Sequence, residues 1–522
     1  MSEFVELPNT WAFAPLSSIA DVNPRSFCPL PSAVSQPVHF VPMSAVTEEF
    51  GGIDISARRP LGDVQKGYTS FLTNDVLLAK ITPCMENGKL ALVPPLQDHL
   101  AFGSTEFHVL RAKDQVQPSW LAYFLSQSAF RRLARQNMTG SAGQLRVATT
   151  WLSDALIPVA PATEQTRIVA KLEELLSDLD AGVAELKAAQ KKLAQYRQSL
   201  LKAAVEGALT AAWRTQHQPT ETGAQLLQRI LQERRARWEA RQLAKFAEQG
   251  KTPPKDWQKK YPEPVQPDTS GLPELPQEWV WASVEQIASD ERYSLAIGPF
   301  GSNLKVPDYR NSGVPLVFVR NIRSGNYGGA YTKYVTSEKA EELSAHSIAA
   351  GDVLITKMGE PPGDADVYPS DQPPAIITAD CIKVRCWAGL LRPDFLKTVI
   401  NSYIGQRQIE PMTQGVAQKK VSLGRFTSLA VPIPSLHEQD LLMKMVSAAD
   451  GDAVAQEAAI AFSLQQSTAQ RQNILRAAFS GQLVPQDPHD EPASVLLERI
   501  RAERAAQGAV KKPRGRKAKE AA

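Results

Sequence analysis

The chain has 522 residues, of which 43% are hydrophobic and 22% charged. A chain of this length has room for roughly three to four globular domains with ample core. Lys and Arg number 58 against 55 Asp and Glu, a net charge of +3. This balance excludes a uniformly basic, polymer-coating protein, but it leaves room for a local basic face.

The cysteines and the N-terminus point to an intracellular protein. Cys28, Cys84, Cys381 and Cys386 are too few and too scattered for a disulfide framework, and none forms a Cys-x-x-Cys pair. The N-terminal segment has neither the basic flank nor the apolar stretch of a signal peptide, and no apolar run is long enough to span a membrane. We therefore expect a cytoplasmic chain with reduced thiols and without a bound metal.

The chain contains an internal repeat. Residues 7–20, LPNTWAFAPLSSIA, resemble residues 275–288, LPQEWVWASVEQIA, and residues 197–209 match residues 471–483 at an offset of 274. The offset drifts in the globular parts and is constant over the helical parts. An added residue shifts the apolar register of a packed helix, whereas loops tolerate insertions. Each half is therefore predicted to be one variable module followed by one helix of fixed length.

The expected fold is α+β, with two pseudo-repeated α/β modules separated by two long antiparallel coiled-coil helices. Each module has short β-rich runs, one amphipathic helix (120–135 and 395–409) and a closing apolar strand. The predicted segments are a first module (1–157), a helical spacer (158–212), a connector (213–271), a second module (272–432), a second helical spacer (433–484), and a C-terminal helix with a basic tail (485–522).

Leucines at seven-residue steps predict that residues 164–207 form one long helix. The first stripe consists of Leu172, Leu179, Leu186, Leu193 and Leu200, and the weaker second stripe of Val446, Ala453, Ile460, Ser467 and Ile474. Two such helices in one chain most simply pair with each other, although an ordinary buried helix of a bundle would show a similar stripe. Gly207 and Gly481 are plausible caps of the helix C-termini.

The two remaining segments are basic. A basic helix at about 223–249 precedes a Pro- and Lys-rich stretch, and its LLQRILQER segment returns as LLERIRAER at 496–504. The tail KKPRGRKAK at 511–519 is expected to be disordered. It is either a solvated tail or a loose electrostatic contact with nucleic acid or with an acidic partner.

The sequence lacks the motifs of common catalytic sites. No P-loop, HExxH, GxSxG or strand-linked GxGxxG occurs, and the seven histidines lie far apart. Together these absences favour a binding protein over an enzyme.

Polar and basic residues gather in Gly-flanked loops of both modules, and we interpret them as DNA contacts. Arg and Lys suit guanine edges, Asn and Gln suit adenine edges, and Lys, Ser and Thr also hold phosphates. The alternative is that such loops are simply turns. The candidates in the first module are Lys80, Thr82, Asn87, Lys89, Ser141, Gln144 and Arg146; those in the second are Ser302, Asn303, Lys305, Arg320, Asn321, Lys357, Gln418, Lys419 and Lys420.

On these features the sequence resembles the specificity subunit of type I restriction-modification systems. The resemblance rests on the LPxxW module starts, ITPCMENGK with GSTEFHVLR, GPFGSNLK, VRNI, the helix openings PATEQ and PSLHEQ, and AAVEGAL against AAFSGQL. It implies a non-catalytic subunit of a phage-defence system, in which the two α/β modules are target recognition domains that each bind half of a bipartite, asymmetric DNA site. The first module has Pro42-Met43 where the second has Arg320-Asn321, so the VRNI contacts transfer only to the second.

The resemblance also implies partners. Two modification (methyltransferase) subunits would dock on the helical regions, with Glu164, Gln165, Glu438 and Gln439 as candidate docking residues. Those subunits would bring S-adenosylmethionine, and restriction subunits would bring ATP and Mg²⁺ chemistry, so no cofactor is expected in this chain. The alternatives are the same architecture in a type IIB-like assembly, a coiled-coil scaffold that binds proteins, and an enzyme with an unrecognised site.

Overall fold

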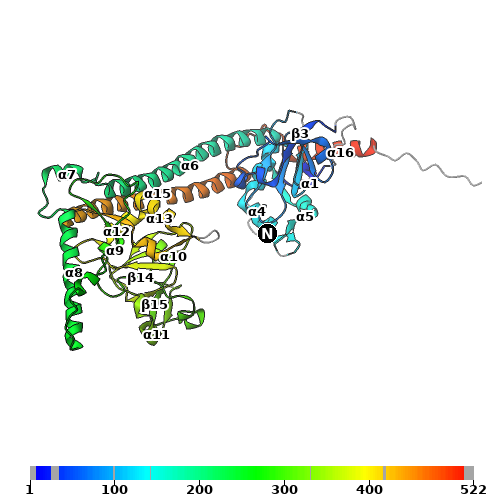
Figure 1. Cartoon of the computed structure of the whole chain (residues 1–522). Coiled ribbons are helices and arrows are strands. Elements are labelled where there is room, and N and C mark those ends of the chain that lie inside the picture. The colour runs from blue at the N-terminus through cyan, green and yellow to red at the C-terminus, as the bar shows by residue number, and fades with distance from the viewer. Residues whose placement is uncertain are drawn as a thin grey trace, which may run out of the picture. The chain divides into compact units, whose positions relative to one another are not determined.

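The computed structural model describes residues 7–24, 34–97, 100–141, 143–329, 331–414 and 419–510 (Figure 1). Contacts divide the chain into two units, residues 1–187 with 461–522, and residues 188–460. Each unit therefore holds one α/β module together with part of each long helix. Within the described ranges, no helix is both long enough and apolar enough to cross a membrane.

The module of the first unit is built from short strands and helices. In chain order they are β1 (Ala12–Pro15), α1 (Leu16–Ile19), β2 (Ala20–Val22), β3 (Pro37–Val41), β4 (Arg58–Pro60), α2 (Leu61–Val64), β5 (Thr69–Leu72), β6 (Val76–Ala79), β7 (Leu90–Leu92), β8 (Leu100–Gly103), β9 (Phe107–Ala112), α3 (Pro118–Ser126), α4 (Ser128–Gln136), β10 (Met138–Thr139), β11 (Arg146–Val147), α5 (Thr149–Asp154) and β12 (Leu156–Val159).

The module of the second unit repeats this plan. Its elements are β13 (Val280–Ser283), α9 (Val284–Ile287), β14 (Leu295–Ile297), β15 (Val314–Val317), α10 (Val319–Ser324), β16 (Lys333–Val335), α11 (Ser337–Glu342), β17 (Ser347–Ile348), β18 (Val353–Thr356), β19 (Ala365–Val367), β20 (Ala375–Ile377), β21 (Cys381–Val384), α12 (Pro393–Asn401), α13 (Tyr403–Met412), β22 (Thr413–Gln414), β23 (Lys420–Val421), α14 (Leu423–Phe426) and β24 (Ala430–Ile433).

The strand orders establish that the modules are structural repeats. In the first, the four-stranded sheets run β2-β9-β6-β7 and β4-β3-β8-β5; in the second, β14-β21-β18-β19 and β16-β15-β20-β17. In both, one pair is parallel, β3 with β8 and β15 with β20, at the same place in the order. The first strand also pairs with the closing strand, β1 with β12 and β13 with β24. The predicted pseudo-repeated α/β architecture is confirmed.

A buried carboxylate anchors equivalent strands in both modules. The Arg111 guanidinium donates two hydrogen bonds to Asp75 (2.8 and 2.7 Å), and Arg385 does the same to Asp352 (2.8 Å each). Both carboxylates are 1% exposed and also accept a backbone N–H, so each buried charge is paired and hydrogen-bonded.

The amphipathic helix predicted in each module is in fact two helices. Residues 120–135 fall in α3 and α4, which meet at Gln127, and residues 395–409 fall in α12 and α13, which meet at Ser402. The backbone is extended at both junctions (ψ 136° and 162°). The Ser402 hydroxyl accepts a hydrogen bond from the Gly405 N–H, so it caps a new helix where periodicity alone predicted continuation.

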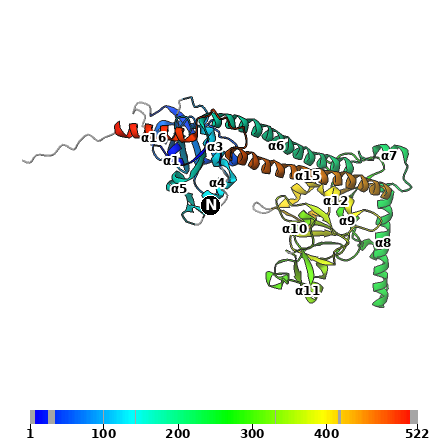
Figure 2. The same cartoon turned by 180° about the vertical axis from the view of Figure 1, so that it is seen from behind.

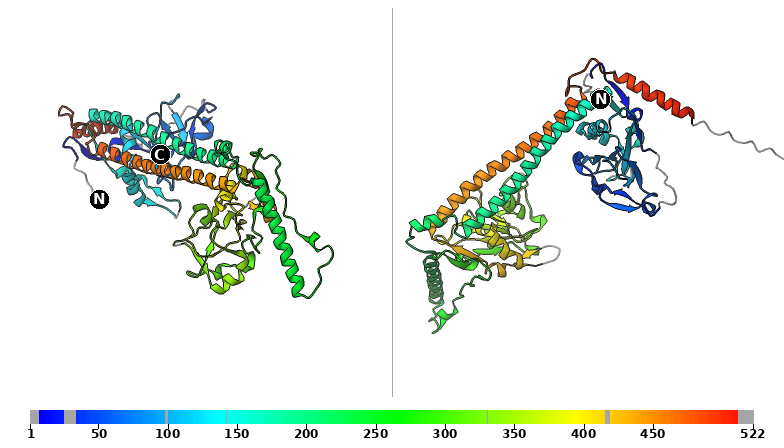
Figure 3. Two further views of the ribbon diagram at one scale, coloured as in Figure 1. Left: turned by 90° about the vertical axis from the view of Figure 1, so that its left-hand side faces the viewer. Right: turned by 90° about the horizontal axis from the view of Figure 1, so that it is seen from above.

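Two 44-residue helices carry the predicted heptad stripes, α6 (Ala162–Val205) and α15 (Leu436–Phe479). They lie side by side and antiparallel (Figures 1 and 3). In the first unit Asp180 pairs with Arg471, and in the second Arg197 pairs with Glu457 at 2.7 Å. Gly207 and Gly481 follow the helix ends with φ of 75° and 71°, so both predicted caps are confirmed.

A shorter helix after each long helix packs on a module, which explains the LLQRI and LLERI echo. The helix α8 (Gly223–Glu248) packs on β13 and β24, and α16 (Ala493–Val510) packs on α1 and β1 (Figure 2). The buried residues correspond one to one: Leu226, Leu227 and Ile230 in α8, and Leu496, Leu497 and Ile500 in α16. The tail 511–519 lies outside the described residues.

The first module and the long helices share one core. Trp120 is fully buried and contacts both Trp11 and Phe479, with ring centroids 5.4 and 4.6 Å apart. Phe479 belongs to the end of α15, so the C-terminal part of the chain completes the core of the N-terminal module. A second cluster in each module, around Leu77 and Leu354 respectively, fills the space between its two sheets.

Candidate nucleic-acid interface

In the first module, a short hairpin joins the two polar loops predicted from sequence. Strands β10 and β11 form this hairpin, and Arg146 in β11 bridges to Ile81. The Thr82 N–H donates to the Leu145 carbonyl (3.0 Å), and the Val147 N–H donates to the Lys80 carbonyl (2.9 Å). The segments 79–89 and 139–146, which are about fifty residues apart in sequence, therefore form one surface.

The second module repeats this junction. Its hairpin β22–β23 bridges to the loop after β18 through Lys420 and Met358, and the Val421 N–H donates to the Lys357 carbonyl (2.9 Å). Both loops contain a cis proline peptide bond, Thr82–Pro83 in the first module and Glu360–Pro361 in the second. A β-bridge and a backbone hydrogen bond therefore join the loop to the hairpin in both modules.

Two further predicted segments of the second module reach the same place. The Lys357 ammonium lies 4.7 Å from the centroid of the Phe300 ring, which belongs to the GPFGSNLK turn. Arg323, in the helix that carries VRNI, donates to the Pro361 carbonyl (2.6 Å) and to Asp364 (2.7 Å). Four segments that sequence analysis singled out separately thus form one surface.

Some of the predicted contacts are exposed, and others are used within the chain. The exposed ones with a described side chain are Asn87, Ser141, Gln144, Asn303, Lys305, Arg320, Lys419 and Lys420. Asn87 donates to Glu48 (2.8 Å), and Arg320 donates to the Tyr331 carbonyl (2.9 Å). Gln418 lies outside the described residues, and for Ser302 only the backbone is described.

Asn321 is a correction to the sequence prediction. Its side chain is 8% exposed, its Oδ1 accepts from the Phe318 N–H (2.9 Å), and its Nδ2 donates to the Asn326 carbonyl (2.8 Å). The amide thus closes the first turn of α10, and its donor and acceptor sides are both occupied within the module. Asn321 shapes the loop rather than presenting an edge for DNA.

Other predicted contacts are partly committed to their own module. Arg146 donates to both oxygens of Glu106, and this pairing holds the pKa of the Glu106 carboxyl below its usual value. The Lys89 ammonium donates to the Met43 carbonyl (3.1 Å), and the Thr82 hydroxyl donates to the Gly143 carbonyl (3.2 Å). Lys80 and Lys357 are half-buried, and burial lowers the pKa of Lys357. These groups fix the loops in place.

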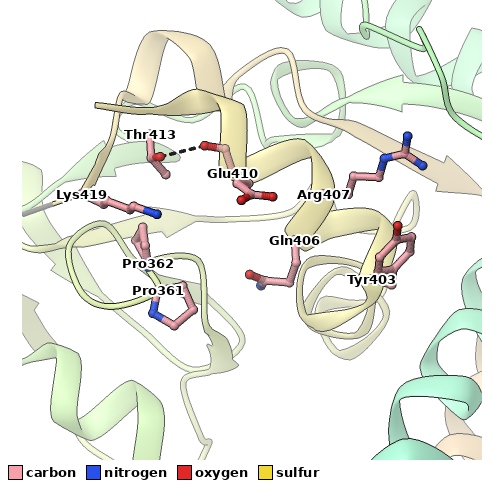
Figure 4. Close-up of a pocket in the computed structure, with 8 residues that line it drawn as sticks. All are labelled: Pro361, Pro362, Tyr403, Gln406, Arg407, Glu410, Thr413 and Lys419. Carbon is pink, nitrogen blue, oxygen red and sulfur yellow. Dashed lines mark hydrogen bonds between the residues drawn. The ribbon is translucent and has the colours of Figure 1, made fainter. Parts of the chain in front are cut away.

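A cavity beside this surface is lined by aromatic and basic residues that were not among the predicted contacts. The cavity has a volume of about 410 Å³ and lies between α13 and the loop of Pro361 and Pro362, as Figure 4 shows. Tyr403, Gln406 and Arg407 line it from the helix, opposite Pro361 and Pro362. Tyr403 is 55% exposed, and Phe300, which does not line the cavity but contacts Lys357 on the adjoining surface, is 62% exposed. The polar character of the loops does not indicate these aromatic residues, although the glycines on either side of Phe300 were a signal.

At the helix starts, two buried glutamates tie the long helices to the modules. Glu164 accepts from the Trp11 indole (3.0 Å) and from Gln486 (2.5 Å). Glu438 accepts from the Trp279 indole (2.9 Å), and its other oxygen accepts from Thr210 and Arg214. The tryptophan of each LPxxW start is therefore the partner of the glutamate of each helix opening.

The glutamines that follow these glutamates in sequence, Gln165 and Gln439, also tie the long helices to the modules. Gln165 accepts from the Gln117 N–H (3.1 Å) and donates to the Ala160 carbonyl (2.8 Å). Gln439 accepts from the Arg392 N–H (2.8 Å) and donates to the Leu390 carbonyl (2.9 Å). All four side chains are at most 1% exposed. This burial contradicts the prediction that they form a docking surface, because their polar atoms already serve the chain itself.

Two corresponding cavities lie beside these helix starts. In the first unit the cavity of about 490 Å³ lies between the starts of α3 and α6, and in the second the cavity of about 680 Å³ lies between those of α12 and α15. Gln117, Thr163 and Thr166 line the first, and Arg392, Asp440 and Lys444 line the second. The two repeats therefore have a similar hollow at equivalent places.

The Glu164 site gives a pH-dependent prediction. Burial raises the pKa of Glu164 above its ordinary value of 4.5, so the folded chain binds this proton more tightly than the unfolded chain does. Glu164 should therefore stabilise the fold most below pH 4.5, and this contribution should be lost as the pH rises through the folded-state pKa.

We expect Glu164→Gln to remove that part of the pH dependence. Thermal unfolding of both proteins between pH 4 and pH 8 should show the difference in stability changing in favour of the variant as the pH rises. Glu173→Gln, at an exposed position of the same helix, is the matched control. Parallel pH curves for wild type and Glu164→Gln would contradict the assignment.

Among the described residues, no group of three or more His, Cys, Asp or Glu side chains is placed to hold a metal ion. The described cysteines, Cys84, Cys381 and Cys386, are free thiols.

Comparison with known proteins identifies relatives over most of the chain. No protein-family model matches it. The EcoEI specificity subunit of the type I restriction enzyme from Escherichia coli is 25% identical over 488 residues, covering 85% of this chain and 77% of the relative. The EcoAI specificity subunit from Escherichia coli is 26% identical over 486 residues, covering 84% and 77%.

The fold has a solved counterpart. One chain, from a structure of the complex assembly and conformational transition of the type I R-M system, superimposes with a TM-score of 0.63 at 19% identity. The match covers 92% of this chain and 100% of that one. In sequence, the chain resembles type I restriction enzyme specificity subunits, and in fold it resembles a chain of a type I R-M system, so the expected resemblance is confirmed.

Proposed function

We propose that this chain, which resembles type I restriction-modification specificity subunits in sequence and fold, is the DNA-specificity subunit of such an enzyme. It would bind a bipartite, asymmetric site, with one module reading each half. The observation that carries the proposal is the repeated junction between a polar strand-end loop and a hairpin, at Ile81 with Arg146 and at Met358 with Lys420.

The exposed side chains at these junctions have the chemistry that DNA recognition needs. Gln144 and Asn303 can present amide edges to adenine, while Lys305, Lys419 and Lys420 can meet phosphates or guanine. The strand order is the same in both modules, but the loops that the strands support differ in sequence. The two modules should therefore recognise different base sequences. Of the DNA contacts predicted from the sequence, those with exposed side chains are the residues that we propose to touch DNA.

The partners in this proposal are two modification subunits and, through them, restriction subunits. A chain with two similar units offers two similar docking places. We place these at the cavities beside the helix starts, with Thr166 and Asp440 at corresponding positions 274 residues apart. The buried Glu164, Gln165, Glu438 and Gln439 would support these surfaces from within.

The chain itself would be non-catalytic. S-adenosylmethionine would be held by the modification subunits, and ATP and Mg²⁺ by the restriction subunits. The assembly would act in the cytoplasm, where it meets both host and invading DNA.

Methylome sequencing tests the proposal. A host that expresses this chain together with its modification subunit should acquire methylation at one two-part motif with a fixed gap. A host that expresses the modification subunit alone is the control. Methylation that is absent, or that lacks a two-part motif, would refute the proposal. Binding of duplex DNA by the complex should also weaken steeply as salt rises, since phosphate contacts release counterions.

A further inference from the structure

Phe300 is an apolar side chain held in an exposed position by a constrained turn. It follows β14 and is 62% exposed. A Cβ on Gly298 would lie 1.9 Å from the Thr378 carbonyl oxygen, so only glycine fits there, and Gly301 has φ of +49°. The Asn303 N–H donates to the Phe300 carbonyl (3.0 Å) and closes the turn. The conformation of the turn therefore holds the Phe300 ring in its exposed position.

The side chain of Lys357 contacts the Phe300 ring. The Lys357 Nζ lies 4.7 Å from the ring centroid, within the range of a cation–π contact. The Lys357 backbone is held on both sides, because its N–H donates to the Asp380 carbonyl (2.7 Å) and its carbonyl accepts from Val421 (2.9 Å). The cation and the ring thus form one preorganised pair.

The surroundings favour nucleic acid as the cover for this ring. An apolar ring that stays in water forgoes burial energy of about 25 cal/mol per Å². Lys420 lies close enough to Lys357 to act on its charge, and Lys305 belongs to the same turn segment as Phe300. Two carboxylates are also near, because Asp380 lies beside Lys357 and Asp308 accepts from the Lys305 N–H (2.7 Å). The three lysines outnumber these two carboxylates. In such an arrangement the aromatic ring can contact stacked bases while the neighbouring cations contact the phosphates on either side.

We propose that Phe300 inserts as a wedge at a base-pair step of duplex DNA, while Lys357 holds the ring and carries its charge toward the adjacent phosphates. The proposal rests on the proposed function, since it requires that the second module bind DNA. Insertion would unstack the step and bend the duplex, so recognition by this module would include the deformability of the sequence.

The test uses the full chain in complex with its modification subunits and a duplex that contains the methylated motif. Adenines in and beside the half-site of the second module are replaced one at a time by 2-aminopurine, whose fluorescence rises on unstacking. Wild type should raise the fluorescence at one step. Phe300→Ala should abolish this rise and weaken binding about tenfold or more, whereas Phe300→Trp should retain both.

Tyr293 provides the matched control. It lies before the other end of β14, is 40% exposed and has the Arg292 guanidinium 4.6 Å from its ring centroid. Tyr293→Ala should bind DNA within twofold of wild type. If Phe300→Ala unstacks and binds DNA as wild type does, the wedge is refuted while the proposed function stands. If Phe300→Ala instead loses the modification subunits, the ring is a protein contact and the wedge is equally refuted. A wild-type complex that binds no DNA would refute the proposed function itself.

Discussion

Exchanging residues 1–157 for the first module of a relative should change one half of the methylated motif and leave the other half and the gap unaltered. The reason is that the exposed loops at the Ile81–Arg146 junction belong wholly to this module. The second-module loops, including Lys419 and Lys420, are unchanged by the exchange. Methylome sequencing of the chimaera reads both halves at once.

The exchange must keep the core that the module shares with the rest of the chain. Trp11 and Trp120 contact Glu164 and Phe479, so a donor that has tryptophan at both positions is required. The reciprocal exchange of residues 272–432 is the matched control and should alter only the other half. A motif that changes in both halves after either exchange would contradict independent reading by two modules.

Lengthening the paired helices by four residues each should widen the unread gap of the motif by about two base pairs. A helix rises ~1.5 Å per residue and B-DNA ~3.4 Å per base pair, so four residues add about 6 Å. The insertions belong after Gln190 in α6 and after Ala459 in α15, between the two sets of ion pairs that join the helices. There they leave the Asp180–Arg471 pair in one unit and the Arg197–Glu457 pair in the other.

An insertion of the same length outside the paired helices shows whether the gap depends on the length of the helices or only on the length of the chain. Four residues after Gly250, in the exposed turn that follows α8, should leave the gap unchanged. Both variants are read by methylome sequencing with the same modification subunit. A gap that stays constant after the helix insertions, with methylation retained, would show that the helices do not set the spacing.

The spacing of apolar residues predicted the long helices well, because the apolar face of a helix repeats at a fixed interval along its own sequence. The seven-residue steps through Leu172 and Leu193 predicted α6, and the constant offset between Gly207 and Gly481 predicted two equal helices with equal caps. The same reasoning failed at Gln127 and Ser402, where apolar spacing continues through a break. There the backbone conformation is set by packing and by a capping hydroxyl rather than by period.

The sequence predicted which segments form the candidate site, but it did not predict which of their side chains are free to bind a ligand. Loop chemistry correctly singled out segments that meet, such as those of Lys80 and Arg146. It could not distinguish an amide turned outward, as in Gln144, from one that closes its own helix turn, as in Asn321. It also passed over Phe300, because exposure of an apolar ring is a property of the folded turn.

The sequence by itself determined the duplication, the two long helices and the resemblance to specificity subunits, since all three are carried by order and spacing along the chain. Only the tertiary structure decided that Glu164 and Glu438 bind the tryptophans of the module starts, that α16 covers the first module as α8 covers the second, and which polar loops meet. These are contacts between residues far apart in sequence, and their geometry depends on how the whole chain closes its cores rather than on any local pattern.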